Sequence, residues 1–369
     1  MAKILVLSSF TTSLFWFRMD MMKTFIDKGY EVCACGDESE EEWSGKFNTF
    51  GIKYRQIFVR RNGINPMNDI KTFFSIRKII KEIKPDKIFS YQAKSIIYGG
   101  IAARFCGVKE VYPLIAGIGS VILSTSKKAK IIQKILMFEY RTALKKSKVI
   151  FFQNQDDVNE FRKRKAIKKQ KIIMIPGSGV NLERFTPKPM PEKFAFLCIS
   201  RLIRHKGVTE YLKACSMIKE EFPEIRCMLV GPYDSNPSGI GPDVIKQYTD
   251  KGIIEYFGEQ KDVVPFIEQC SVFVLPSYRE GTPKSVLEAM ACERAVITTN
   301  APGCKETVVD GENGYLVPIQ NVYELYEAMK KIYQNQDVLS NMAKVGRHKA
   351  ETVFDVNIVN RKICDGMNL

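Results

Sequence analysis

The sequence lacks an apolar run long enough to cross a bilayer, which excludes a membrane-spanning helix of the usual length. Its first residues, MAKILVLSSF, carry one lysine and no small-residue cleavage site, so they predict a buried first strand rather than a signal peptide. No Cys/His set has zinc spacing, because Cys33 and Cys35 are only one residue apart. The ten cysteines are scattered, mostly in apolar segments, which predicts reduced core thiols in a cytosolic protein.

Acidic residues are too few to balance the basic ones. The chain has 56 Lys and Arg against 41 Asp and Glu, a net charge of +15. Such an excess favours a polyanionic partner, namely nucleic acid, an anionic membrane surface or a phosphorylated ligand. The sequence also lacks a ribonucleoprotein, helix-turn-helix or zinc motif. A basic nucleic-acid-binding protein therefore stays only as an alternative of a different class, and no nucleic-acid partner is expected.

A length of 369 residues exceeds what one hydrophobic core usually supports and predicts two domains. Segments typical of strands and helices alternate in both halves, which predicts an α/β protein with two doubly wound, Rossmann-like domains facing a cleft. The proline-rich stretch RFTPKPMPEKF marks a linker near 177–192. We expect an amino-terminal domain over 1–176, a second domain over 177–354, and a carboxyl-terminal helix over 355–369 that packs back on the first domain.

The stretch SYREGTPKSVLEAMA places Glu280 and Glu288 around a loop that opens a helix. Thr282 suits the N-cap and Pro283 the first helical position. The free N–H groups of that helix predict an anion site between the two carboxylates, and carboxylates suit a ligand rich in hydroxyls. The alternative is an ordinary solvated helix face, but the surroundings of Glu288 are apolar and small.

A second loop, SRLIRHKGV, follows the predicted strand FLCIS. Arg201 and Lys206 are five residues apart at that strand's carboxyl end, so together they can clamp a diphosphate. His205 lies beside them, and its role as a site residue or a surface histidine stays open.

These two motifs resemble those of the retaining GT-B glycosyltransferases of family 4. The resemblance implies that Arg201 and Lys206 neutralise the departing diphosphate of a UDP-sugar, that Glu288 binds the ribose, and that Glu280 holds the sugar. It also implies that the base lies near Gln260, and that no metal and no cofactor besides the UDP-sugar substrate is needed. The backbone that holds the sugar would be that of Gly281, Thr282, Pro283, Lys284 and Ser285.

The first half is similar to the bacterial members that add a hexosamine to a polyprenyl-diphosphate-linked sugar, of the α-1,3-N-acetylgalactosaminyltransferase type. The matching motifs are FRM near 18, KS near 95, GIGS at 117–120 and HKGV at 205–208. Two departures stand out: the loop SSFTTSLFWFR lacks the family's glycine, and Tyr91, Gln92 and Ala93 stand where a histidine is common. The expected acceptor-binding residues are Arg18, Tyr91, Lys94, Gly117 and Gly119.

Residues 127–148 predict one amphipathic helix, with Ile131, Ile135, Phe138 and Leu144 on one stripe. It is either an ordinary packed helix with a basic solvent face or a helix on the inner face of the cytoplasmic membrane. The resemblance and the charge together favour a peripheral enzyme that transfers a hexose or N-acetylhexosamine to a lipid-linked saccharide. A soluble acceptor, such as a sugar phosphate, and a GT-B epimerase are the alternatives. The lysines expected at the lipid diphosphate are Lys127, Lys128, Lys130, Lys134, Lys145 and Lys146.

Overall fold

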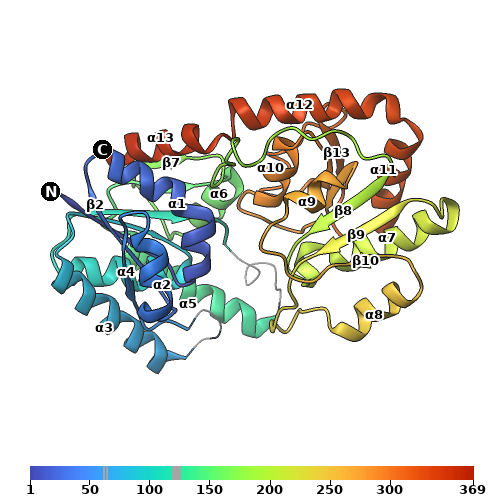
Figure 1. Cartoon of the computed structure of the whole chain (residues 1–369). Coiled ribbons are helices and arrows are strands. Elements are labelled where there is room, and N and C mark those ends of the chain that lie inside the picture. Colours follow the sequence, from blue (N-terminus) through green and yellow to red (C-terminus); the bar gives the residue numbers. More distant parts are fainter. Residues whose placement is uncertain (61–62, 64, 119–125) are drawn as a thin grey trace. The chain divides into compact units, whose positions relative to one another are not determined.

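The computed structural model of the chain describes residues 1–60, 63, 65–118 and 126–369 (Figure 1). The chain forms two compact units, one made of Met1–Ser178 with Val359–Leu369 and the other of Gly179–Ile358. Each unit contains a parallel sheet with helices on both faces. The predicted fold class, two doubly wound α/β domains, is confirmed.

The sheet of the first unit has seven parallel strands in the order β3-β2-β1-β4-β5-β6-β7. The chain runs outward from β1 to β3 and then restarts at β4, on the other side of β1. The strands are β1 (Lys3–Leu7), β2 (Glu31–Gly36), β3 (Lys53–Gln56), β4 (Lys87–Tyr91), β5 (Glu110–Ile115), β6 (Ile150–Phe152) and β7 (Ile172–Met174). The helices are α1 (Thr11–Asp27), α2 (Glu40–Asn48), α3 (Pro66–Ile83), α4 (Ala93–Phe105), α5 (Lys127–Leu144), α6 (Gln155–Lys163) and, from its fourth residue on, α13 (Val356–Met367).

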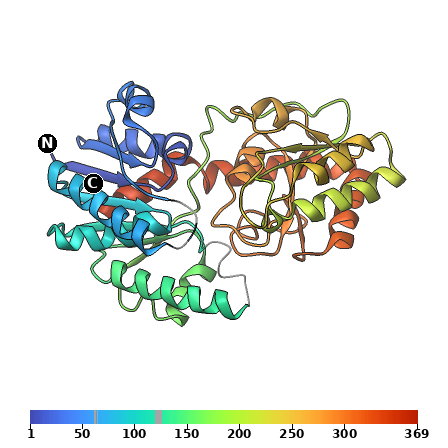
Figure 2. The ribbon, with the colours of Figure 1, turned by 90° about the horizontal axis from the view of Figure 1, so that it is seen from below.

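Apolar side chains that alternate along the strands fill the two faces of this sheet. On one face, strand residues pack with Phe25 of α1 and Ile363 of α13. On the other face, α3, α4 and α5 pack in a row over the sheet (Figures 1 and 2). Helix α13 is fixed at its end, where Lys87 Nζ and Tyr112 Oη donate hydrogen bonds to the carbonyl of Met367 at 3.0 and 3.2 Å.

The sheet of the second unit has six parallel strands in the order β10-β9-β8-β11-β12-β13. The strands are β8 (Ala195–Ile199), β9 (Arg226–Val230), β10 (Glu255–Tyr256), β11 (Val272–Leu275), β12 (Ala295–Thr299) and β13 (Gly314–Val317). The α-helices are α7 (Val208–Glu221), α8 (Pro242–Asp250), α9 (Val264–Glu268), α10 (Lys284–Ala291), α11 (Val322–Gln334) and α12 (Leu339–Thr352). Two short 3-10 helices, η2 (Arg204–Lys206) and η3 (Gln336–Val338), complete this unit.

In both sheets the strand order reverses once, and ligands of doubly wound folds bind beyond the carboxyl ends of the strands at that point. The reversal lies between β1 and β4 in the first unit and between β8 and β11 in the second. These two edges are therefore where functional side chains are expected to gather.

Some predicted elements differ in extent from the observed ones. Helix α1 begins at Thr11 rather than near Phe17, because Asp37 accepts hydrogen bonds from the N–H and the hydroxyl of Thr11 at 2.9 and 3.1 Å. Helix α5 ends at Leu144 instead of continuing to Lys148. Within the described ranges, no helix is both long enough and apolar enough to cross a membrane.

Candidate active site

The loop between β8 and α7 presents the two cations predicted for the donor diphosphate. Arg201 follows β8, and Lys206 ends η2, immediately before Gly207. Gly207 has φ +72°, and a Cβ there would lie 1.9 Å from the carbonyl oxygen of Pro276. Only glycine allows this loop to pass so close to the end of β11. The close passage places Lys206 beside the loop that carries Glu280.

Lys206 and Glu280 form an ion pair across the reversal point of the second sheet. Lys206 Nζ lies 2.5 Å from Glu280 Oε1, and both side chains are mostly buried. The N–H of Glu280 donates to the carbonyl of Pro302 at 2.9 Å, which fixes the loop after β11 against the loop after β12. Gly303 is required in that contact, because its Cβ would lie 2.3 Å from the carbonyl oxygen of Glu280. The predicted catalytic pair is thus brought together by three loops.

Arg201 also has an acidic partner, which the sequence analysis missed. Its NH1 lies 2.6 Å from Asp234 Oδ2 in the loop after β9. The signal was present in the sequence, because the stretch GPYDSN follows the predicted strand RCMLV and so ends at the same edge of the sheet. Both cations of the expected diphosphate clamp are therefore held in ion pairs when no ligand is present.

Helix α10 carries Glu288 into the interior of this edge. Glu288 has a side chain that is 13% exposed, and Lys284 Nζ lies 4.0 Å from its Oε1. Burial raises the pKa of Glu288, and the charges of Lys284 and Arg184 partly oppose this rise. The predicted need for a partner is thus met only by a distant ammonium group.

The start of α10 differs from the prediction. The helix begins at Lys284, and Pro283 rather than Thr282 occupies the N-cap position, with no side-chain cap from the described residues. Proline takes this position because its backbone is extended, with ψ 110°, whereas the first helical residue needs a helical ψ. Thr282 and Ser285 are half-buried, and Gly281 is buried beside Glu280. The predicted donor loop Gly281–Ser285 therefore does lie at the uncapped start of the helix.

Two further residues lie at the periphery of this edge. Gln260 is exposed beyond β10, and its Nε2 donates to the carbonyl of Phe257 at 2.6 Å. His205 Nε2 lies 3.3 Å from Ser238 Oγ, and burial, together with the charges of Arg201 and Lys206, lowers the pKa of His205. A lowered pKa keeps this imidazole neutral near pH 7.

The residues predicted for the acceptor lie in the first unit. Arg18 is buried and lies over the ring of Tyr91, with 5.0 Å between Cζ and the ring centroid. Lys94 forms an ion pair with Asp69 at 2.8 Å, which gives it a structural partner. Gly117 follows β5 with φ +112°, whereas Gly119 lies outside the described residues.

Helix α5 presents a different face from the one predicted. Leu144 is buried, but Ile131, Ile135 and Phe138 are 61%, 50% and 69% exposed, so the four do not form one stripe. The buried face consists instead of Ala129, Gln133, Met137, Tyr140, Ala143 and Leu144. The three exposed side chains, here called the apolar ridge, follow the i, i+4, i+7 spacing of one helical face. Their inward placement was wrong because the real inward face uses smaller and polar residues, which a hydrophobic stripe does not reveal.

Exposed lysines surround this apolar ridge. They are Lys127, Lys130, Lys134, Lys145 and Lys146, while the side chain of Lys128 lies outside the described residues. A hollow of about 340 Å³ beside α5 is lined by Gln133, Lys134, Met137, Phe138, Arg141 and Arg164. The predicted basic residues thus share a surface with exposed apolar side chains.

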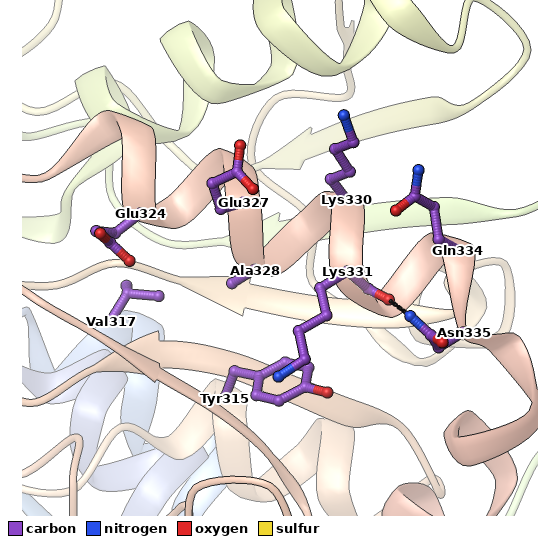
Figure 3. Close-up of a pocket in the computed structure, with 9 residues that line it drawn as sticks. All are labelled: Tyr315, Val317, Glu324, Glu327, Ala328, Lys330, Lys331, Gln334 and Asn335. Carbon is purple, nitrogen blue, oxygen red and sulfur yellow. Dashed lines mark hydrogen bonds between the residues drawn. The ribbon is translucent and has the colours of Figure 1, made fainter.

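A second hollow lies away from the predicted donor residues, between the edge strand β13 and helix α11 (Figure 3). It measures about 390 Å³, and Lys331 Nζ covers the ring of Tyr315 at 4.5 Å from the centroid. Its described lining includes neither cation of the clamp and neither glutamate of the pair. Nor do the described residues contain a group of three or more His, Cys, Asp or Glu side chains that could hold a metal ion.

Comparison with known proteins agrees with this arrangement. Residues 181–349 match the model of "Glycosyl transferases group 1", and residues 3–154 match that of "Glycosyl transferase 4-like". The chain is 29% identical, over 96% of both chains, to the N,N'-diacetylbacillosaminyl-diphospho-undecaprenol alpha-1,3-N-acetylgalactosaminyltransferase of Campylobacter jejuni. It is 28% identical to the UDP-Gal:alpha-D-GlcNAc-diphosphoundecaprenol alpha-1,3-galactosyltransferase of Escherichia coli, over 81% of this chain and 78% of that one.

Solved structures share the fold at low sequence identity. Sucrose-phosphate synthase from Thermosynechococcus elongatus superposes with a TM-score of 0.82 at 18% identity, over 99% of this chain and 98% of that one. HepE of Anabaena, in complex with UDP-glucose, gives 0.80 at 17% identity over the whole of both chains. The two family matches together cover both units, and the chain therefore belongs to the GT-B glycosyltransferases, with a second half of group 1 and a first half of the glycosyltransferase 4-like type.

Proposed function

We propose that this enzyme transfers a hexose or N-acetylhexosamine, with retention of anomeric configuration, from a UDP-sugar to a polyprenyl-diphosphate-linked saccharide. The product would enter bacterial surface-glycan or glycoprotein-glycan assembly. The observation that carries the proposal is the Lys206–Glu280 ion pair at the reversal point of the second sheet, beside the uncapped start of α10. The names of the Campylobacter jejuni and Escherichia coli relatives support the lipid-linked acceptor.

In this proposal the second unit binds the donor. The diphosphate of the UDP-sugar would draw Arg201 away from Asp234 and Lys206 partly away from Glu280, because two cations favour a doubly charged ligand over separate carboxylates. The cations then stabilise the negative charge that grows on UDP as the glycosidic bond breaks. The released Glu280 carboxylate accepts hydrogen bonds from sugar hydroxyls, and Glu288 does the same for the ribose.

The first unit, in this proposal, takes the acceptor and attaches to the inner face of the cytoplasmic membrane. The surface of α5 combines three exposed apolar side chains with exposed lysines, the composition expected of a helix at an anionic lipid interface. Helix α3 adds a second set, because Met67, Ile70 and Phe74 are also more than half exposed. Attachment at this surface would bring the enzyme to an acceptor that is itself held in the membrane.

Transfer assays with purified protein test the proposal. The protein is incubated with UDP-N-acetylgalactosamine, UDP-N-acetylglucosamine, UDP-galactose or UDP-glucose, with and without an undecaprenyl-diphosphate-linked monosaccharide. We expect release of UDP that depends on one donor and increases when the acceptor is added. A soluble sugar phosphate that serves as well as the lipid-linked sugar would favour the alternative acceptor class.

A further inference from the structure

Arg18 is a buried cation without a protein partner. It lies two turns into α1, and its side chain belongs to a residue that is only 3% exposed. Its Nε is buried without a hydrogen-bond partner, and no described residue forms an ion pair with the guanidinium. Burial lowers the pKa of Arg18 to about 10, opposed only by the nearby Tyr91. A buried charge normally has a counter-ion or a set of hydrogen bonds.

The other fully buried arginine shows what a structural role looks like in this chain. Arg294 donates hydrogen bonds to the carbonyl oxygens of Ile267, Lys188, Cys292, Glu293, Pro189 and Glu268, at 2.8–3.2 Å. Those bonds fasten the segment before β8 to the second unit. Arg18 has none of them within the described structure, so a role in holding the fold together does not explain it.

The surroundings of Arg18 are those of a ligand site. Tyr91, over which it lies, is the last residue of β4, and the Tyr91 hydroxyl is 3.1 Å from that of Ser13 in the first turn of α1. Helices α1 and α4 both begin beside the reversal point between β1 and β4, and in the described structure neither has a side-chain cap. Two helix starts and an unpartnered guanidinium at one sheet edge all favour negative charge.

The loops at this edge are also held in fixed positions. Gln92 adopts φ +70°, a strained conformation for a residue other than glycine. Its Oε1 accepts hydrogen bonds from Ser8 Oγ, Ser9 N–H and Ser9 Oγ, each at 2.9 Å. This clamp joins the end of β1 to the start of α4, so the edge is ordered before any ligand binds. Backbone strain of this kind is typical of functional sites.

We propose that Arg18 binds a phosphate oxygen of the substrate held by the first unit, the diphosphate of the lipid-linked acceptor. The chemical requirement is an oxyanion small enough to enter a nearly closed edge, which both substrates of the proposed reaction carry. The acceptor is assigned because Arg18 lies in the first unit, whereas the donor clamp lies in the second. This assignment rests on the proposed function, but the anion site itself does not.

Arg18→Met keeps the length of the side chain and removes its charge. Binding of inorganic pyrophosphate is measured by calorimetry with the donor site saturated by UDP. We expect the variant to bind pyrophosphate about tenfold to a hundredfold more weakly than the wild type, the usual effect of losing a charge-assisted hydrogen bond. The KM for the lipid-linked acceptor should rise to a similar extent, and Arg18→Lys should restore part of both losses.

Stability distinguishes this site from a structural arginine. Because an unpartnered buried charge destabilises the folded state, Arg18→Met should raise the urea midpoint, whereas the matched variant Arg294→Met should lower it. Unchanged pyrophosphate binding, or a lower urea midpoint for Arg18→Met, would overturn the anion site. A tenfold loss of UDP affinity in Arg18→Met would move the anion to the donor and overturn the acceptor assignment. If the wild type transfers no sugar at all, the proposed function fails while the pyrophosphate result still stands.

Discussion

Lys206 Nζ and Glu280 Oε1 lie 2.5 Å apart and join the loop after β8 to the loop after β11. The two residues are 74 positions apart in the chain, yet both follow strands that are neighbours at the reversal point of one sheet. The fold thus creates a contact between opposite charges at the place where doubly wound proteins bind their ligands.

Lys206→Ala should lower kcat more than it raises the KM for the donor. The ammonium interacts most strongly with the diphosphate when its charge has grown in the transition state, so its loss should cost about 1.5–3 kcal/mol of transition-state stabilisation. Steady-state kinetics with varied UDP-sugar measure both constants. Lys213→Ala, on the exposed face of α7, is the matched control and should behave as the wild type. Equal kinetics for Lys206→Ala and Lys213→Ala would remove Lys206 from the site.

Gly207→Ala should destabilise the enzyme and displace the loop of Lys206. Gly252 is a suitable control, because it has φ +66° but nothing within 4 Å of a Cβ, whereas a Cβ on Gly207 would meet the carbonyl of Pro276 at 1.9 Å. Gly252→Ala should cost ~1–2 kcal/mol for its left-handed conformation. Gly207→Ala should cost a further ~1–3 kcal/mol from overpacking and also reduce turnover. Equal urea midpoints for the two variants would contradict the close contact.

Glu288→Gln should make the stability of the protein depend less on pH. Burial raises the pKa of Glu288 in the folded state, so the folded protein binds this proton more tightly than the unfolded chain. The carboxylate therefore lowers stability as pH rises from the ordinary glutamate pKa through the raised one, and has no such effect below both. Urea unfolding at several pH values should show Glu288→Gln gaining on the wild type as pH rises. The exposed Glu220→Gln serves as the control, and a constant difference across pH would contradict the prediction.

The α5 surface predicts binding to anionic vesicles. Reversing Lys130, Lys134 and Lys145 to glutamate should release the protein from phosphatidylglycerol vesicles, because each basic residue near such a surface contributes roughly 1 kcal/mol. Wild-type binding should weaken with salt, since the Debye length falls from about 10 Å at 0.1 M to about 3 Å at 1 M. Co-sedimentation measures both effects.

The apolar ridge can be tested separately in the same assay. Ile131→Ser with Phe138→Ser should also weaken vesicle binding, but without changing its salt dependence, because no charge is altered. Reversal of Lys213, Lys251 and Lys261, which are exposed on the second unit, is the matched control. Equal release by the two triple reversals would show that net charge, rather than the α5 surface, attracts the vesicles.

The sequence predicted the fold class because strands such as KILVLSSF and VFVLPS are apolar and alternate with amphipathic helices. It did not predict helix α2, which consists largely of acidic and polar residues and buries only Trp43 and Phe47. The inward face of α5 was also mistaken, because Gln133 is buried there while Phe138 faces outward. Periodicity locates a helix, but tertiary packing decides which of two mixed faces points inward.

The candidate site was predictable where motifs are local. Glu280, Glu288, Arg201 and Lys206 stand in two short stretches, so spacing and resemblance were enough to find them. The pairing of Arg201 with Asp234 depends on the order of β8 and β9 in the sheet, which spacing does not give. The missing partner of Arg18 likewise emerges only from packing, because the sequence shows the arginine but not its burial.

Sugar transfer by the wild type and by Glu280→Gln is the most direct test of the central claim. The purified proteins receive a UDP-sugar and an undecaprenyl-diphosphate-linked monosaccharide, and the lipid product is separated and its new linkage determined by NMR. We expect the wild type to form a product with the anomeric configuration of the donor, and Glu280→Gln to form almost none while its circular dichroism spectrum and UDP binding stay close to those of the wild type. Normal transfer by Glu280→Gln, or a wild-type product of inverted configuration, would contradict the account.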